Sequence, residues 1–186
     1  ILGASYRYKN FGNHILVSSL EHNSVMSSCL RLQEEGFEVE IIPVNKDGIV
    51  DIDVLKSMIR PTTILVSVTS VDSELGIKQP IEEIGNFLKN YDHIVFHTDA
   101  SQAIGKINID IQNADLVTIA PHKFYGLMGI SILVKRNNIE LKPQILGGKS
   151  TTVYRSGTPN TNLIASTAVA IEKAYKNLDE RYKYVK

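Results

Sequence analysis

The stretch TTILVSVT, residues 62–69, is a nearly continuous run of β-branched and apolar residues. A half-buried strand alternates polar and apolar side chains, whereas a strand covered on both faces reads as an unbroken run of this kind. Such strands are typical of parallel sheets that lie between two layers of helices. Residues 62–69 therefore predict a central strand of an α/β sheet.

Segments with the same character flank this strand on both sides. The further predicted strands are residues 14–19, 38–44, 93–99, 115–120 and 129–135. Apolar residues at helical spacing separate them, and the predicted helices are residues 24–35, 51–59, 80–90 and 162–184. This alternation predicts a three-layer α/β/α fold with a mainly parallel sheet.

Length and composition limit the function. A chain of 186 residues suits one compact domain, here residues 1–186, and its 20 basic residues balance its 20 acidic ones. No net charge therefore favours nucleic acid or an anionic membrane, and neither a membrane span nor a signal peptide is visible. The single cysteine, Cys29, excludes an internal disulfide and favours a reducing cytoplasm. Because the chain starts without Met, we expect an excised piece of a longer protein.

Polar side chains stand where two neighbouring predicted strands end. Residues 93–99 finish in Asp99, with Gln102 close behind, and residues 115–120 are followed by His122 and Lys123. Ligands of open parallel sheets bind beyond the carboxyl ends of the strands. These side chains therefore predict a binding site at that edge of the sheet.

Lys123 and Asp99 each have a functional interpretation and a structural one. A partly desolvated lysine has a lowered pKa and can form a Schiff base, but a lysine can also simply extend into solvent. The carboxylate of Asp99 can be the charge partner of a protonated pyridine nitrogen, or it can cap the segment that follows. Together the two residues are the anchors that pyridoxal phosphate requires at opposite edges of its ring.

Five motifs extend this reading, in the order LEHNSV (20–25), ILVSVTSVDSELGIKQPI (64–81), HTDASQAIGK (97–106), HKFYG (122–126) and YRSGTPN (154–160). In order and spacing they resemble the cysteine desulfurases of the class V aminotransferase family, over essentially the whole chain. The resemblance implies the large domain of a type I pyridoxal-phosphate enzyme, with a mostly parallel sheet of seven strands. It also implies that a phosphate-binding turn precedes this chain and that a small domain follows it.

The resemblance assigns roles to individual residues. Lys123 would form the Schiff base with pyridoxal 5'-phosphate and later carry a proton at the substrate α-carbon. Asp99 would keep the pyridine nitrogen protonated, Gln102 would donate to the phenolic oxygen, and His122 would lie by the phosphate. His22 would stack on the ring face, although a histidine at a strand end is otherwise usually a polar cap. No metal site is expected.

Three more positions bear on the cofactor. Thr158 would reach the phosphate bound to the other subunit, which implies a homodimer, whereas RSGTP without the resemblance is only a turn. Ser73 stands where the family usually has an asparagine that contacts cofactor and substrate, and a serine lacks the paired donor and acceptor of an amide. Ala120 stands where the family tends to have a phosphate-binding serine, so a hydrogen bond of roughly 1.5–3 kcal/mol should be lost.

The resemblance implies an enzyme that converts L-cysteine to L-alanine and an enzyme-bound persulfide. The sulfur would pass to an acceptor protein for iron–sulfur cluster assembly or tRNA thiolation. The nucleophilic cysteine would lie beyond Lys186, because Cys29 lies between Val25 and Leu32 at helical spacing and should face the core. The chain alone is therefore expected to be inactive.

Two alternatives remain open at this point. One is another enzyme of the same family, such as a selenocysteine lyase or an aminotransferase of small substrates. The other is a non-catalytic paralogue that keeps the fold and the dimer interface, and the departures at Ser73 and Ala120 are its motivation.

Overall fold

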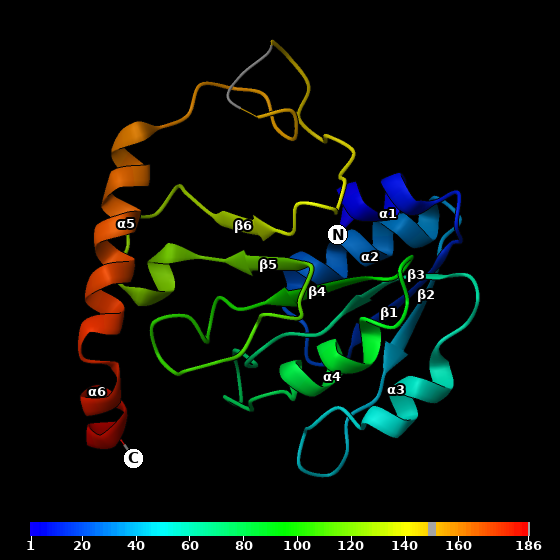
Figure 1. Ribbon diagram of the computed structural model, residues 1–186, viewed down its shortest axis with the longest axis horizontal. Coiled ribbons are helices and arrows are strands. Elements are labelled where there is room, and N and C mark those ends of the chain that lie inside the picture. Colours follow the sequence, from blue (N-terminus) through cyan, green and yellow to red (C-terminus); the bar gives the residue numbers. More distant parts are fainter. Residues whose placement is uncertain (149–151, 186) are drawn as a thin grey trace.

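The computed structural model describes residues 1–148 and 152–185, and a six-stranded sheet forms its centre (Figure 1). The order across the sheet is β2-β1-β3-β4-β5-β6. The first five strands pair in parallel, and β6 runs antiparallel to β5. In chain order the strands are β1 (His14–Ser18), β2 (Glu38–Ile42), β3 (Thr63–Ser67), β4 (Val95–Asp99), β5 (Leu116–Ile119) and β6 (Ile132–Lys135).

The expected class of fold is confirmed, but the expected strand count is wrong. The described residues form six strands rather than the seven that the resemblance implied. The six correspond to the six apolar segments visible in the sequence. β6 is the last strand of the sheet, and Leu133 and Val134 within it are about half exposed.

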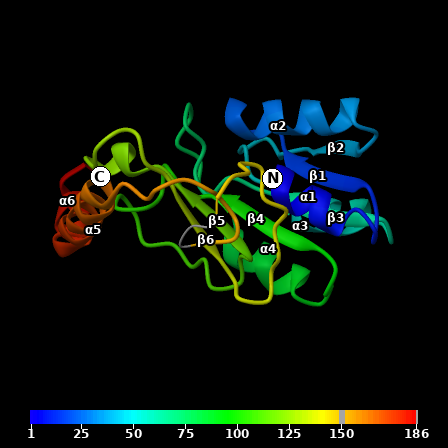
Figure 2. The same ribbon diagram turned by 90° about the horizontal axis from the view of Figure 1, so that it is seen from above.

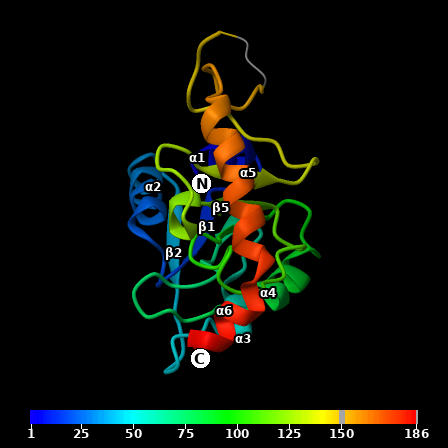
Figure 3. The same cartoon turned by 90° about the vertical axis from the view of Figure 1, so that its left-hand side faces the viewer.

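Helices cover both faces of the sheet (Figure 2). α1 (Leu2–Tyr8) and α2 (Asn23–Glu34) pack on one face, where Ala4 and Leu32 contact a cluster that includes Leu65. The opposite face carries α3 (Ile52–Met58), α4 (Ile81–Leu88) and α5 (Thr161–Lys176). Figure 3 shows α5 crossing one side of the molecule, with α6 (Leu178–Val185) after it.

The burial of β3 explains why TTILVSVT decides the fold. All five residues of β3 are buried, and so are all five of β1 beside it. Val66 contacts the cluster under α3 and α4, while Ile64 and Leu65 contact the cluster under α1 and α2. Each such side chain contributes roughly 1.5–3 kcal/mol when it is fully buried. The unbroken apolar run is thus the direct consequence of two covered faces.

Local signals account for most helix boundaries. Asp51 caps α3, where its carboxylate accepts hydrogen bonds from the backbone N–H groups of Asp53 and Val54, and Pro80 directly precedes α4. Two features differ from expectation. The sequence analysis did not identify α1, and the helix expected over residues 162–184 is divided at Asn177, whose φ of −132° is not helical.

The parallel pairing places the carboxyl ends of β1, β3, β4 and β5 at one edge of the sheet. Beyond β5 the chain enters a short 3₁₀ helix, η1 (Pro121–Phe124), which contacts α5. Between β6 and α5 the described residues are irregular. Within the described part of the chain, no helix is both long and apolar enough to cross a membrane.

Candidate active site

A cavity of about 370 Å³ opens at the carboxyl edge of the sheet. It contains six of the residues that the sequence analysis singled out for cofactor binding, together with Ala120. These are His22, Ser73, Asp99, Gln102, His122 and Lys123. The remaining walls come from Leu20, Ser24, Thr69, Val71, Ser101, Thr118 and Ser131. Of the predicted site residues only Thr158 lies elsewhere; it is exposed and does not line this cavity.

Lys123 is presented by a tight turn. The η1 helix starts at Pro121, the backbone N–H of Lys123 donates to the Ala120 carbonyl at 3.0 Å, and that of Gly126 donates to the Pro121 carbonyl at 2.9 Å. Tyr125 ends the turn with φ 66°, a left-handed conformation that is costly for a residue with a side chain. A Cβ atom at Gly126 would lie 2.9 Å from the Pro121 oxygen, so only glycine fits there.

The exposure of Lys123 differs from the desolvated environment that we expected. Its side chain is exposed in the described chain, although it lines the cavity. A ligand or a covering segment would have to remove water from the amine. Lys123 therefore lies after the end of β5, as predicted. The described residues do not shield its amine from water, which differs from the prediction.

Asp99 ends β4 and also begins the next turn. One carboxylate oxygen accepts a hydrogen bond from the backbone N–H of Ser101 at 2.9 Å, so the structural interpretation as a cap is correct. The same side chain also lines the cavity, so the cap leaves Asp99 in a place where the functional interpretation remains a prediction. Gly105 ends the turn with φ +75°, and a Cβ atom there would lie 2.8 Å from that of Ala174 in α5.

His22 likewise combines a structural contact with a place in the cavity. It is the N-cap of α2, and its Nδ1 accepts a hydrogen bond from the backbone N–H of Ser24 at 3.2 Å. Because Nδ1 accepts, the neutral ring carries its proton on Nε2. The cap thereby holds the ring in the cavity lining.

Gln102 accepts a hydrogen bond from the ammonium group of Lys106 through its side-chain oxygen. Partial burial lowers the pKa of Lys106, and the positive charge of Lys123 lowers it further. Two lysines therefore act on one side of the cavity, which favours an anionic ligand. Ser73 donates to the Glu74 carboxylate at 3.4 Å, and the methyl group of Ala120 offers no hydrogen bond.

Sequence reasoning missed Glu21, although it lies in the LEHNSV motif. Its side chain is 9% exposed, and one oxygen, Oε1, accepts hydrogen bonds from Ser18 at 3.2 Å and Ser67 at 3.5 Å. The other oxygen, Oε2, is buried and has no partner among the described residues. Burial, and then the negative charge of Asp99, raise the pKa of Glu21 to about 8. A neutral acid therefore lies beside the cavity at pH 7.

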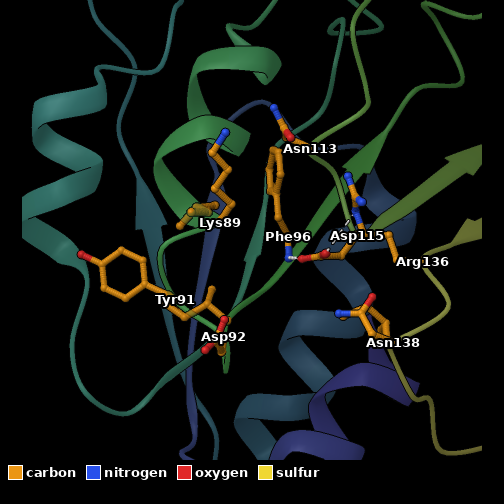
Figure 4. Close-up of a pocket in the computed structure, with 11 residues that line it drawn as sticks. Lys89, Tyr91, Asp92, Phe96, Asn113, Asp115, Arg136 and Asn138 are labelled. Atoms are coloured by element: carbon orange, nitrogen blue, oxygen red, sulfur yellow. Dashed lines mark hydrogen bonds and ion pairs between the residues drawn. The ribbon is translucent and has the colours of Figure 1, made fainter.

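A second cavity, of about 480 Å³, lies at the amino ends of β4 and β5 (Figure 4). Here Asp115 accepts a hydrogen bond from the backbone N–H of Phe96 at 2.8 Å and lies 3.6 Å from the Arg136 guanidinium. Arg136 also donates to the Ala114 carbonyl. These polar groups join neighbouring strands, and no residue predicted for the site is found there.

Comparison with known proteins now adds to this geometry. The family model described as aminotransferase class V matches residues 2–181. The chain therefore belongs to the class V aminotransferase family, whose members depend on pyridoxal phosphate.

Individual relatives agree with this family. The mitochondrial cysteine desulfurase of Arabidopsis thaliana is 41% identical over all of this chain and 42% of its own length. The cysteine desulfurase IscS of Ehrlichia chaffeensis is 44% identical over 97% of the chain and 45% of its own length. The chain thus spans less than half the length of these relatives.

Solved structures share the fold. A NifS-like protein superposes with a TM-score of 0.91 at 30% identity, over 96% of this chain and 50% of that one. SspA in complex with cysteine gives a TM-score of 0.85 at 38% identity, over 92% of this chain and 50% of that one.

Proposed function

We propose that the protein is a pyridoxal-phosphate-dependent cysteine desulfurase, which converts L-cysteine to L-alanine and retains the sulfur as an enzyme-bound persulfide. The observation that carries the proposal is the meeting of Lys123, Asp99, Gln102 and His22 in one cavity at the carboxyl edge of the sheet. Relatives that bear the name cysteine desulfurase, and the complex of SspA with cysteine, support L-cysteine as the substrate.

The donor set of the cavity fits the cofactor. Lys123 and Asp99 come from adjacent strand ends, as the covalent anchor and the partner of the pyridine nitrogen require. When bound, pyridoxal phosphate would supply an electron-withdrawing ring that stabilises negative charge at the substrate α-carbon. His22 would stack on the ring, Gln102 would donate to its phenolic oxygen, and His122 would face the phosphate.

The protein's own groups then have separate tasks. Lys123 would hold the cofactor covalently and, once released by the substrate, would carry a proton at the substrate α-carbon. Asp99 would accept the proton-bearing pyridine nitrogen as a hydrogen-bond partner and make no covalent bond. Ser73 would contact cofactor and substrate through a shorter side chain than the asparagine usual in the family, and this difference bears on substrate choice.

Persulfide formation needs a reactive thiolate, and Cys29 does not supply it. As expected from its helical spacing, Cys29 is only 1% exposed, and burial raises its pKa to about 11. A thiol in this state is protonated and inert at neutral pH. The proposal therefore treats residues 1–186 as the cofactor-binding large domain and assigns the nucleophilic cysteine to another part of the protein. The 186-residue chain alone is expected to be inactive.

The proposal includes a homodimer in which Thr158 contacts the phosphate held by the partner subunit. Large apolar side chains near the cavity and after β6 are strongly exposed, and a second subunit would cover them. They are Tyr125, Met128, Leu146 and Val153, each at least 79% exposed. Sedimentation equilibrium of the purified full-length protein would test this, and a monomer at micromolar concentration would contradict it.

The persulfide sulfur would pass to an acceptor protein for iron–sulfur cluster assembly or tRNA thiolation, and we propose that this takes place in the cytoplasm. The name IscS among the relatives supports the pathway, and the single reduced cysteine is consistent with the compartment. One of the relatives is mitochondrial. Fractionation of cells that express the tagged protein would show in which compartment it resides.

The decisive test is cysteine-dependent sulfide release by purified full-length protein supplied with pyridoxal phosphate and a dithiol reductant, which cleaves the enzyme persulfide to sulfide. We expect alanine and sulfide in equal amounts, together with visible absorption of the bound cofactor. Bound cofactor with transamination or selenide release, but without sulfide release, would favour another enzyme of the family. Protein that does not bind the cofactor at all would favour the non-catalytic alternative, which Ala120 in the cavity wall motivates.

A further inference from the structure

A row of buried polar side chains crosses the sheet directly behind the cavity wall. Ser67 in β3 and His97 in β4 are register partners, and Ser67 Oγ lies 2.8 Å from His97 Nδ1. On the other side of the ring, His97 Nε2 lies 2.9 Å from Thr118 Oγ1 in β5. Ser67 also donates to Glu21. The row therefore links a buried acid to Thr118, which lines the cavity.

The direction of these hydrogen bonds follows from the number of protons. Burial lowers the pKa of His97 to about 3, so the ring is neutral and carries one N–H. The only hydroxyl proton of Ser67 is donated to Glu21 Oε1. Ser67 must then accept from His97, which places the ring proton on Nδ1. The unprotonated Nε2 accepts in turn, and Thr118 must donate its own proton to it.

We propose that Glu21 and Ser67 are positioning residues that hold His97 in the Nδ1–H tautomer and thereby make Thr118 a hydrogen-bond acceptor toward the cavity. Thr118 and Asp99 are register partners on neighbouring strands, which lie about 4.8 Å apart, and both line the cavity. A Thr118 hydroxyl that is committed to His97 does not donate to Asp99. The Asp99 carboxylate then receives no hydrogen bond from Thr118 and stays available to a cationic ligand.

The neutral state of Glu21 belongs to the same arrangement. Oε1 accepts from Ser18 and Ser67, while burial and the charge of Asp99 raise the pKa of Glu21 to about 8. The titratable groups that act on this region are Asp99 from β4 and Cys29 from α2. Because Glu21 is uncharged at pH 7, Asp99 is the anion that a cationic ligand meets.

The test is the tautomer of His97, measured by ¹⁵N NMR on purified full-length protein labelled at histidine. The chain has five histidines, so a His97→Asn variant assigns the signals. We expect a ring that stays neutral from pH 5 to 9 with its proton on Nδ1. In Ser67→Ala the Nδ1 partner is gone, and the proton should move to Nε2 and be donated to Thr118.

Ser70→Ala is the matched control, because Ser70 is also buried, just beyond the end of β3, but bonds to Thr98 at 2.8 Å on the opposite face. It should leave the His97 tautomer unchanged. A wild-type ring protonated on Nε2, or a tautomer that Ser67→Ala does not alter, would overturn the proposal. If the spectrum of His97→Asn shows an unfolded protein, Glu21→Gln takes its place as the variant that identifies the His97 signals. Glu21 bonds to Ser67, and Ser67 bonds to His97.

The tautomer of His97 can be measured whatever reaction the protein catalyses. The effect that we expect on catalysis, in contrast, rests on the proposed function. In Ser67→Ala we expect kcat to fall about tenfold with little change in KM, because Thr118 then donates to Asp99 and weakens its hold on the cofactor. Ser70→Ala should stay within about twofold of the wild type. If the protein releases no sulfide at all, the proposed function fails while the NMR result still decides the tautomer.

Discussion

The two ends of the same strands carry cavities of similar size but opposite character. At the amino edge, the cavity of about 480 Å³ has a mixed lining in which Asp115 accepts from the backbone of β4 and lies beside Arg136 (Figure 4). At the carboxyl edge, about 370 Å³ is lined by an amine, a carboxylate, two imidazoles and an amide. Polar groups at both edges bond to nearby backbone, but among the described residues only the carboxyl edge brings together the side chains predicted for the cofactor.

Two carboxyl groups, the half-buried Asp115 at the amino edge and the buried Glu21 at the carboxyl edge, illustrate how the two edges differ. Burial raises the pKa of both, but at Asp115 the Phe96 N–H and the charge of Arg136 oppose it. At Glu21 the serine and backbone hydrogen bonds that oppose burial are outweighed, and the charge of Asp99 adds to it. The two groups differ in the sign of the neighbouring charge: Arg136 opposes the rise in pKa at Asp115, whereas Asp99 adds to it at Glu21.

The largest expected effect is that of Lys123→Ala in the full-length protein. Visible absorption of the bound cofactor and cysteine-dependent sulfide release should disappear together, with at least a ~10³-fold loss of turnover, because no other group replaces the amine. Lys89→Ala, at the amino-edge cavity, is the control and should change neither. Normal turnover in Lys123→Ala would refute the assignment of the whole carboxyl edge.

Asp99→Ala should cause the next largest loss. Some cofactor should remain bound through Lys123, but turnover should fall by about 10²-fold, because the pyridine nitrogen loses its charge partner. Asp115→Ala is the counterpart at the other edge. It should lower the free energy of unfolding by about 1–3 kcal/mol, the cost of an unpaired backbone N–H, and leave kcat of the folded protein unchanged. Denaturant titration and steady-state kinetics on both variants separate the two effects.

Glu21→Gln tests the neutral acid through the pH dependence of stability. Between pH 4.5 and about 8 folded Glu21 keeps a proton that the unfolded chain releases, so the free energy of unfolding falls as pH rises through that window. The variant lacks this loss and should be more stable than the wild type by about 5 kcal/mol at pH 9, with little difference at pH 4. Chemical denaturation at both pH values measures it. A constant difference between the two proteins would mean that Glu21 does not titrate in this window.

Much of the sheet could be predicted because burial on two faces leaves a direct mark on sequence. Asp99 and Lys123 were identifiable for the related reason that a charged group directly after such a strand needs a ligand or a partner. α1 was not predicted, because its buried residues are the small Ala4 and Ser5 and no side chain caps its start. The break between α5 and α6 at Asn177 was not predicted, because no glycine or proline marks it in the sequence.

Other features depend on contacts that only folding creates. In the sequence, Glu21 resembles an ordinary surface acid beside His22. Its burial near Ser18, Ser67 and Asp99 is evident only in the folded chain. The seventh strand came from resemblance alone, without an apolar segment in the chain to form it. Thr118 resembles any β-strand threonine, because its significance arises from His97 on the neighbouring strand.

The smallest effect we predict is a gain of affinity at the carboxyl edge. Ala120 lies in the cavity wall where the family tends to have a phosphate-binding serine. Ala120→Ser would restore a hydroxyl that can donate to a phosphate oxygen, and a charge-assisted hydrogen bond of this kind should tighten pyridoxal phosphate binding about tenfold. Titration of the cofactor-free protein, followed by visible absorption, gives the dissociation constants. Ala165→Ser, the same change at an exposed position of α5, should leave them unaltered. Equal affinities for the wild type and Ala120→Ser would show that the phosphate binds away from the start of η1, and His122 would then lose its proposed role.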